Sequence, residues 1–375
     1  MSSGHAEVVG GGIGGLTAAT ALALRGWTVR LHERDTRIRT VGAGIYVWDN
    51  GLEALDTIGA AAEGLDDAYE APAITVRASD GRPLYRIDVN QPGGARCVTL
   101  LRDRLIGALH VAAEHAGVEV CTGSAAVAAT ADGTVEFSTG TSTRADLVVA
   151  ADGVHSLLRD RLGISYRRIR MRQGAARVMV SGERPLIPGM DVDQHHEFLG
   201  GRRRLLYTPC TATQTYLAFV ADNDDTATVG PELDLAAWAR AFPLLVPVFD
   251  AARGRALIRW DNFELIRLST WSHGRVAVLG DAAHAQPPYV GQGGGTAMNS
   301  AVGLAAAVSE SADVEDGLNR WEQALRPPIE KAQTTSYRMR LIGSVPEVLR
   351  GPLLGALGRS RSSATSQLIK KRSAA

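Results

Sequence analysis

The first 33 residues change from β-branched to glycine-rich to alanine-rich composition, which predicts a strand, a helix and a second strand. The β-branched segment AEVV is followed by the glycine turn GGGIGG. A helix is expected up to about Arg25 and a strand ending at Glu33, because apolar residues recur first at helical and then at alternating spacing. This order predicts a β-α-β unit, whose two strands pair in parallel.

The same α/β pattern returns in later parts of the chain. Residues 101–115 carry apolar positions at helical spacing, and short strand-like segments follow before the almost wholly apolar ADLVVAADG, which predicts a buried parallel strand. Further on, the strand-like RVAVLGD and a glycine-rich turn precede a helix expected over about 294–308. Residues past Pro327-Pro328 are expected to be helical, and 359–375 to form a solvated tail.

Residues 170–267 show the alternating apolar and polar positions of antiparallel strands. In HHEFLGGRRRLLYTPC the pair Gly200-Gly201 is a two-residue hairpin signal. The predicted fold class is therefore α/β, with a discontinuous Rossmann-like domain and a second, mainly antiparallel β-sheet domain. The predicted ranges are 1–70, 97–170 and 267–345 for the first domain, 71–96 and 171–266 for the second, and 346–375 for a C-terminal helix and tail.

The composition is that of an ordinary globular protein. Of the 375 residues, 45% are apolar and 21% are charged, which argues against disordered and fibrous chains. Lys and Arg together equal Asp and Glu at 40 each, so no broad charge field attracts nucleic acid or an anionic membrane. Three cysteines without CxxC spacing argue against a disulfide framework, and no ligand spacing indicates a metal. The amino-terminal residues lack a signal-peptide core, so a cytoplasmic protein is expected.

Three glycines near the N-terminus point to a dinucleotide. Gly10, Gly12 and Gly15 form the spacing G-x-G-x-x-G between the first strand and the first helix. Such a turn lets a pyrophosphate approach the backbone closely, and the free N–H groups of the helix N-terminus bind it. Glu33 ends the second strand, where a carboxylate accepts hydrogen bonds from ribose hydroxyls and favours NAD or FAD over NADP.

A second glycine-rich segment, LGDAAHAQPPYVGQGGG, distinguishes NAD from FAD. Asp281 follows a strand, where its carboxylate can bond a ribityl chain. Gly293 and Gly294 open a helix, whose N-terminus can stabilise negative charge on a reduced flavin. Nicotinamide needs neither feature, and a non-catalytic dinucleotide-sensing module would not need this second turn. Together with ADGVHSLLR, in which Asp152 and Gly153 end a strand, the segment indicates FAD.

With these three segments, the chain resembles the single-component, FAD-dependent aromatic hydroxylases of the para-hydroxybenzoate hydroxylase fold. The resemblance implies FAD bound tightly but non-covalently by the first domain, and NADH or NADPH bound transiently. LLRDRLIGAL resembles the family's helix whose first arginine contacts the flavin phosphate or ribityl region, which points to Arg102. The candidate cofactor-binding residues are Gly10, Gly12, Gly15, Glu33, Arg34, Arg102, Asp152, Gly153, Asp281, Gly293 and Gly294.

A more detailed resemblance is to the hydroxypyridine-carboxylate oxygenases within that family. It rests on GAGIYVWDNGL, on RLLYTPC followed by QTYLAF, and on RWDNFE. It implies a second domain that binds substrate, with side chains that line the pocket or face the flavin. Where those relatives carry pocket tyrosines, this chain has Ile74 and Phe263, so the identical substrate is not expected. The candidate catalytic residues are Arg204, Tyr216, Tyr46 and Pro288.

Arg204 and three histidines also have structural interpretations. With a two-residue turn at Gly200-Gly201, Glu197 falls opposite Arg204, so a cross-strand ion pair competes with a role in binding a substrate carboxylate. The pair His195-His196 and His284 are expected to be packed or hydrogen-bonded scaffold residues rather than general bases.

The family resemblance also implies a reaction. A nicotinamide coenzyme reduces FAD, O2 adds to give a flavin C4a-hydroperoxide, and one oxygen atom passes to a small hydroxylated aromatic or pyridine carboxylate. Ring opening is the alternative, and simple hydroxylation is expected because two pocket hydroxyls are missing. A flavin halogenase would need a W-x-W-x-I-P segment and a catalytic lysine, neither of which the sequence contains. The sequence does not determine the oligomeric state.

Overall fold

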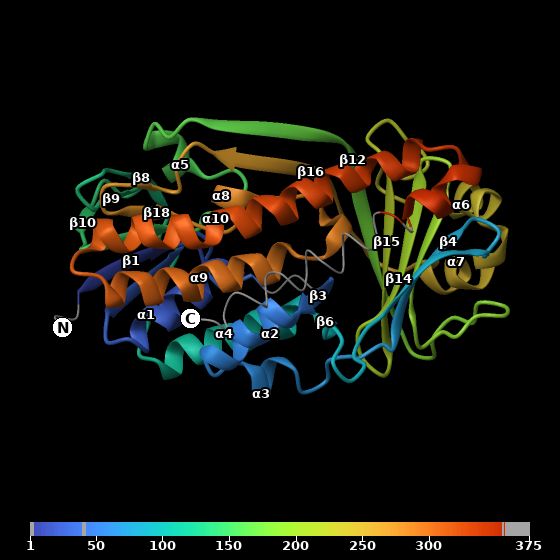
Figure 1. The fold of residues 1–375 in the computed structure, drawn as a ribbon, viewed down its shortest axis with the longest axis horizontal. Helices are drawn as coiled ribbons and strands as arrows, with labels where there is room; N and C mark the ends of the chain where they lie inside the picture. The colour runs from blue at the N-terminus through green and yellow to red at the C-terminus, as the bar shows by residue number, and fades with distance from the viewer. Residues whose placement is uncertain (1–3, 40–42, 355, 357–375) are drawn as a thin grey trace.

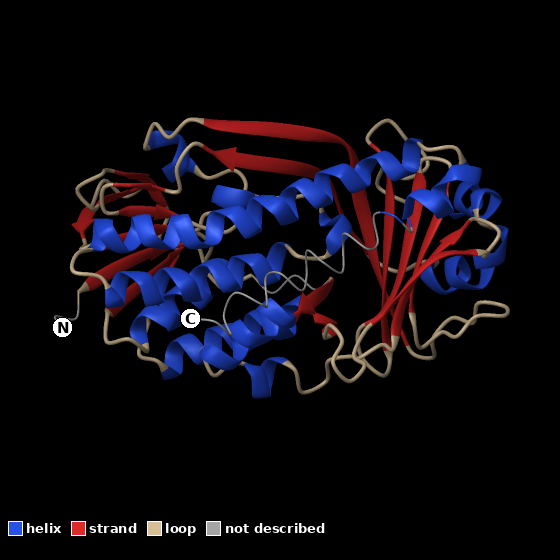
Figure 2. Ribbon diagram, in the orientation of Figure 1, coloured by secondary structure: helices blue, strands red, loops and turns tan. Residues whose placement is uncertain are grey.

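The structure is a computed structural model that describes residues 4–39, 43–354 and 356. The molecule is elongated, with a helix-rich α/β part at one end and a large antiparallel sheet at the other (Figures 1 and 2). The predicted α/β fold class is confirmed. The predicted domain ranges stay a prediction, and the strands β12 (Tyr166–Ser181) and β16 (Leu257–Leu268) extend across two of the predicted boundaries.

The α/β part is built on a mostly parallel sheet. Within the described residues this sheet has six strands in the order β17-β18-β11-β1-β2-β7, and only β17 runs antiparallel to its neighbour. The predicted β-α-β unit at the N-terminus is confirmed. The strands are β1 (His5–Val9), β2 (Thr28–Glu33), β7 (Glu119–Thr122), β11 (Leu147–Ala150), β17 (Ser272–His273) and β18 (Val276–Val278).

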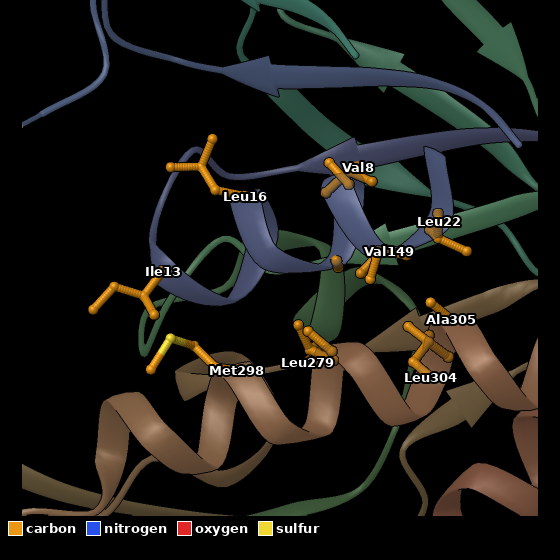
Figure 3. Close-up of a cluster of buried hydrophobic side chains, with 14 of the residues drawn as sticks. Val8, Ile13, Leu16, Leu22, Val149, Leu279, Met298, Leu304 and Ala305 are labelled. Atoms are coloured by element: carbon orange, nitrogen blue, oxygen red, sulfur yellow. The ribbon is translucent and has the colours of Figure 1, made fainter. Parts of the chain in front are cut away.

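Two apolar helices, α1 (Ile13–Ala23) and α9 (Gly293–Glu310), pack against each other beside this sheet. Both are rich in alanine and glycine, and small side chains let their backbones approach closely. Figure 3 shows the core between them and the sheet. Its labelled side chains are Val8, Ile13, Leu16, Leu22, Val149, Leu279, Met298, Leu304 and Ala305.

The antiparallel sheet has seven strands in the described part of the chain, in the order β16-β12-β15-β14-β13-β4-β5. Only the pair β13 and β4 is parallel. The further strands are β4 (Ala73–Ala78), β5 (Pro83–Asp88), β13 (His195–Gly200), β14 (Arg203–Pro209) and β15 (Gln214–Asp222). The predicted second, mainly antiparallel sheet is therefore confirmed.

Strand alternation gives this sheet two different faces. Large apolar residues such as Phe198, Tyr207 and Phe219 pack on the outer face against α6 (Leu235–Ala241), the 3-10 helix η1 (Pro243–Leu245) and α7 (Val246–Ala252). The opposite face, here called the inner face, packs partly against α10 (Val314–Met339) and the short helices η2 (Pro288–Val290) and η3 (Arg340–Ser344). Its polar residues include His195, Glu197, Arg204, Thr208 and Tyr216.

The remaining elements lie outside these two sheets. The strands β3 (Gly44–Trp48) and β6 (Cys97–Leu101) form an antiparallel pair, and β8 (Ala126–Ala129), β9 (Thr134–Phe137) and β10 (Ser142–Arg144) form a small sheet. The other helices are α2 (Asp49–Thr57), α3 (Ala61–Gly64), α4 (Arg102–His115), α5 (Leu157–Arg161) and α8 (Asp281–His284). Among the helices that the structure describes, none is long and apolar enough to cross a membrane.

The hairpin between β13 and β14 differs from the prediction by one position. The turn residues are Gly201 and Arg202, and Leu199, not Glu197, lies opposite Arg204. Gly201 has φ +57°, the left-handed conformation that glycine adopts most easily. Gly200 is instead a strand residue, where a Cβ atom would lie 2.8 Å from the Phe242 ring. Close packing, rather than the turn, therefore requires the first glycine of the pair.

Helix α10 also differs from the prediction, because it begins at Val314 and passes through Pro327 and Pro328. The side chain of Asp313 caps its first turn by accepting from the Asp316 N–H at 2.8 Å. Each interior proline removes one helix hydrogen bond. The buried stripe on both sides of the prolines, which includes Trp321 and Ile329, stabilises the helix against this loss. The tail predicted for residues 359–375 lies outside the described residues.

Candidate active site

The turn between β1 and α1 has the geometry of an anion-binding loop. Gly10 has φ +110° and donates its N–H to the His32 carbonyl oxygen at 2.8 Å. A Cβ atom on Gly15 would lie 1.9 Å from the Gly10 carbonyl oxygen, so the helix can approach the turn only with glycine there. At Gly12 no described atom would lie within 4 Å of such a Cβ, and no described side chain caps the helix. Open space therefore faces the free N–H groups that bind anions at helix N-termini.

Glu33 is joined to this turn. One of its carboxylate oxygens accepts from the Gly11 N–H at 2.9 Å and the other accepts from the Asp35 N–H at 3.0 Å. Its side chain is half-buried beside the turn, and the adjacent Arg34 is exposed. This arrangement supports a nucleotide next to the glycines, and the ribose role of Glu33 stays a prediction.

Asp281 and Arg102 come together although they lie far apart in the sequence. Asp281 is exposed to solvent, yet the surrounding protein desolvates it enough to raise the pKa of its carboxyl group. The nearby guanidinium group of Arg102 acts in the opposite direction. Solvent therefore reaches the Asp281 carboxylate although protein surrounds it on several sides. Arg102 is the first residue of α4, and its backbone N–H donates to the Ala43 carbonyl oxygen at 2.8 Å.

Asp152 belongs to the loop after β11, and its carboxylate is bonded within that loop. It accepts from the Ser156 hydroxyl at 2.5 Å and from the backbone N–H groups of Leu157 at 2.9 Å and Leu158 at 3.3 Å. Burial nevertheless raises the pKa of Asp152, against the effect of these bonds. Gly153 has φ +87°, and no described atom would lie within 4 Å of a Cβ there. Asp152 therefore shapes the loop, while Gly153 lets the loop turn.

The start of α9 carries unsatisfied polar groups. Gly291 has φ +64°, Gly293 leaves open space at the helix start, and Pro288 is exposed. Four nearby side chains have buried polar atoms without a hydrogen-bond partner among the described residues: Trp48, Asn50, Gln286 and Gln292. Buried polar groups are normally paired, so this cluster indicates a bound group with polar edges. A flavin ring has such edges, and the residues present fit it.

The inner face of the antiparallel sheet holds the predicted substrate residues. The Tyr46 hydroxyl, from β3, lies 2.7 Å from the Thr208 hydroxyl, and Thr208 is opposite Tyr216 in the sheet. Burial raises the pKa of both tyrosines, so both phenols stay protonated near neutral pH and can donate hydrogen bonds. Ile74 lies on β4, two strands from Thr208.

Arg204 forms the ion pair that the sequence left open. Its Nη1 atom lies 2.7 Å from the Glu197 Oε1 atom, and both side chains are buried. Glu197 is opposite Leu206, so it reaches Arg204 diagonally across the two strands. The guanidinium group also lies 4.7 Å from the centre of the Tyr289 ring, which contacts Phe263 edge to face. Arg204 is therefore next to the predicted pocket but already has a counter-charge.

The three histidines differ from one another. His196 fits the scaffold interpretation, since its Nε2 atom lies 2.7 Å from the Asp191 carbonyl oxygen and its Nδ1 atom accepts from Arg77 at 3.3 Å. His284 packs against Trp271, and burial lowers its pKa to about 4. His195 is fully buried, and neither ring nitrogen has a partner in the part of the chain that the structure describes.

Sequence reasoning missed the difference between His195 and His196, although a signal was present. In HHEFL, alternate residues point to opposite faces, and Phe198 is the residue suited to an apolar core. That places His196 with Phe198 on the outer face and His195 with Glu197 on the inner face. Among the described residues, no group of three His, Cys, Asp or Glu side chains is placed to hold a metal ion.

Comparison with known proteins gives consistent matches over nearly the whole chain. The model of the FAD binding domain family matches residues 5–334. "Probable 2-heptyl-3-hydroxy-4(1H)-quinolone synthase AqdB2" of Rhodococcus erythropolis is 52% identical over 98% of this chain and 96% of that protein. The crystal structure of a mutant of 2-methyl-3-hydroxypyridine-5-carboxylic acid oxygenase matches with TM-score 0.87 and 33% identity over 96% of both chains. Klebsiella pneumoniae HpxO complexed with FAD and uric acid matches with TM-score 0.82 and 26% identity, over 97% of this chain and 96% of that one.

Proposed function

Since this chain belongs to the FAD binding domain family and is an FAD-dependent aromatic monooxygenase, we propose that it hydroxylates C3 of an uncharged 2-alkyl-4(1H)-quinolone. NADH or NADPH is the reductant. One atom of O2 enters the C3–H bond and the other leaves as water, while the coenzyme gives up two electrons. The product type is the one in the name of the 52% identical relative.

The ion pair between Arg204 and Glu197 is the observation that carries this choice of substrate. A substrate carboxylate would have to approach a guanidinium group that Glu197 already neutralises at 2.7 Å. It would also meet the like charge of Glu197, which is costly in a buried site. An uncharged ring meets neither obstacle. The apolar side chains of Ile74 and Phe263, which are both buried, further favour a ring with few charged groups.

An aromatic or pyridine carboxylate is the second candidate. Arg204 itself favours it, as does the likeness to an oxygenase whose name contains a pyridine carboxylic acid. The two candidates differ in what they ask of Arg204. The carboxylate needs a guanidinium group that has no other counter-ion. The quinolone needs only a surface without net charge.

The residues already described would hold different parts of FAD. The turn with Gly10, Gly12 and Gly15 would take the pyrophosphate, and Arg102 and Asp281 would bind between pyrophosphate and ring. The N-terminus of α9 and the unpaired groups of Trp48, Asn50, Gln286 and Gln292 would surround the ring. Bound FAD supplies electron transfer from the coenzyme and the activation of O2.

The substrate side of the site supplies orientation and a dry surface. Tyr46 and Tyr216 are protonated donors suited to a ring carbonyl oxygen. The buried rings of Phe263 and Tyr289 exclude water from one side of the pocket. Tyr289 is fixed in place because its hydroxyl donates to the Gln173 Oε1 atom at 2.5 Å.

Coenzyme oxidation should reveal the substrate. We expect 2-heptyl-4(1H)-quinolone to stimulate oxidation of NADH or NADPH, with labelled O2 giving a closed-ring product that carries one labelled atom. The measurement is mass spectrometry of the product. Stimulation by 2-methyl-3-hydroxypyridine-5-carboxylic acid alone would favour the second candidate, and an opened ring with two labelled atoms would contradict hydroxylation.

The purified protein should be yellow because of non-covalent FAD. The pyrophosphate turn, Glu33 and Asp281 suit that cofactor, and no flavin-attachment residue is recognisable in the sequence. Acid or heat should release the flavin, and chromatography should identify it as FAD. FMN in the extract, or flavin that stays with the polypeptide, would show that the mode of binding is wrong.

The individual roles of the candidate residues and the cytoplasmic location stay predictions. Either NADH or NADPH is expected as the coenzyme. Small aromatic substrates and O2 are what related enzymes of this family use.

A further inference from the structure

His195 is the first residue of β13 and lies on the inner face of the antiparallel sheet. It is fully buried, and its ring meets those of Tyr46 and Tyr69 edge to face at 5.2 Å and 6.4 Å between centres. Neither Nδ1 nor Nε2 has a hydrogen-bond partner among the described residues. A buried imidazole with both nitrogens unpaired is costly, which points to a partner that is not part of the polypeptide.

The position of His195 places it beside the predicted substrate residues. In the sheet it lies opposite Ile74 on one side. On the other side, the pairing of His196 with Tyr207 puts His195 across from Thr208, whose hydroxyl contacts Tyr46. His195 therefore belongs to the row of inner-face side chains that also contains Tyr216.

The imidazole of His195 is uncharged near neutral pH. Burial lowers the pKa of His195 to about 3, and the neighbouring charges of His196 and Arg184 act in the same direction. A neutral imidazole has one N–H donor and one nitrogen acceptor. It can therefore bind an uncharged polar ring without burying a new charge.

We propose that His195 binds the substrate ring, with its unprotonated nitrogen accepting a hydrogen bond from the ring N–H of the quinolone. This inference rests on the proposed function. Accepting from that N–H leaves more electron density on the ring nitrogen, which is conjugated with C3, the carbon that gains oxygen. His195 is thus a binding residue that also makes ring carbon C3 a better nucleophile.

A comparison of two substrates with three proteins tests this assignment. The substrates are 2-heptyl-4(1H)-quinolone and its N-methyl analogue, and the proteins are the wild type, His195→Phe and His195→Gln. In the wild type we expect kcat/KM to be about tenfold or more higher for the N–H substrate, the effect of one buried hydrogen bond. His195→Phe should reduce this ratio to near one, and His195→Gln, which keeps an acceptor, should restore part of it.

The ratio separates binding from structure, because a variant that only folds less well loses activity towards both substrates equally. Phenylalanine keeps the bulk of the imidazole ring. If the N-methyl substrate reacted more slowly only because its methyl group collides with this side chain, the same difference would therefore persist in His195→Phe. His196→Phe is the matched control, since it alters the outer face and should leave the ratio unchanged. If His195→Phe leaves the ratio of the two kcat/KM values unchanged, the role of His195 is wrong. Turnover of the quinolone by the wild type would still support the proposed function. A wild type inactive on both quinolones would overturn both.

Discussion

Gly15→Ala is expected to yield a protein that purifies without FAD. The new methyl carbon would lie 1.9 Å from the Gly10 carbonyl oxygen, and that oxygen belongs to a turn held by backbone hydrogen bonds. Helix α1 must then move away from the turn, which displaces the N–H groups proposed to bind the pyrophosphate. We expect FAD affinity to fall by roughly 100-fold or more. Overpacking of this kind also destabilises a core by about 1–3 kcal/mol. Flavin absorbance per mole of protein and thermal unfolding measure the two effects.

Two other glycines provide controls for this result. Gly107 lies inside α4, and no described atom would lie within 4 Å of its Cβ, so Gly107→Ala should keep full FAD and gain up to about 1 kcal/mol of stability. A Cβ atom on Gly12 would likewise have no described atom within 4 Å. Gly12→Ala should therefore leave the FAD-free protein as stable as before and still weaken FAD binding, because the methyl group enters the space assigned to the cofactor. Full FAD content in Gly15→Ala would contradict the proposed pyrophosphate site.

Glu197→Gln is expected to lower stability and to change which ligands bind. The change leaves the Arg204 guanidinium group buried without its counter-charge, and breaking a buried pair in this way costs about 3–5 kcal/mol. The freed charge should then attract 2-methyl-3-hydroxypyridine-5-carboxylic acid. We expect this acid to raise the melting temperature of Glu197→Gln and to have little effect on the wild type. Calorimetry and titration of the flavin absorbance measure both changes.

The double variant Glu197→Gln with Arg204→Met should recover most of the lost stability, since neither charge then remains. Asp250→Asn is the surface control, because its partner Arg253 is exposed and such pairs contribute about 0–1 kcal/mol. If Arg204 instead anchors a substrate carboxylate, Arg204→Ala should weaken the binding of such a substrate by about 10- to 100-fold with FAD content unchanged. A wild type that binds the acid as tightly as Glu197→Gln would contradict the neutralised-pocket interpretation.

The sequence alone determined the features that depend on local spacing. The β-α-β unit, the antiparallel segment and the helix α9 follow from apolar residues at two different periods, and period reflects only the geometry of each element. The glycine turn could also be predicted from the sequence, because Gly10 needs a positive φ and Gly15 needs the absence of a Cβ atom. These requirements act within a few residues of one another.

Only the tertiary structure decided the properties that depend on partners from distant segments. Gly200 is a strand residue, and a Cβ atom there would lie 2.8 Å from the ring of Phe242, which directly follows α6 in the sequence but lies far from the hairpin along the chain. The unpaired state of His195 is a statement about every polar group around it, and no single segment contains that information. The neutralisation of Arg204 is of the same kind. Hydrogen-bond satisfaction and charge balance are sums over all neighbours in space, so they are settled only when the chain has folded.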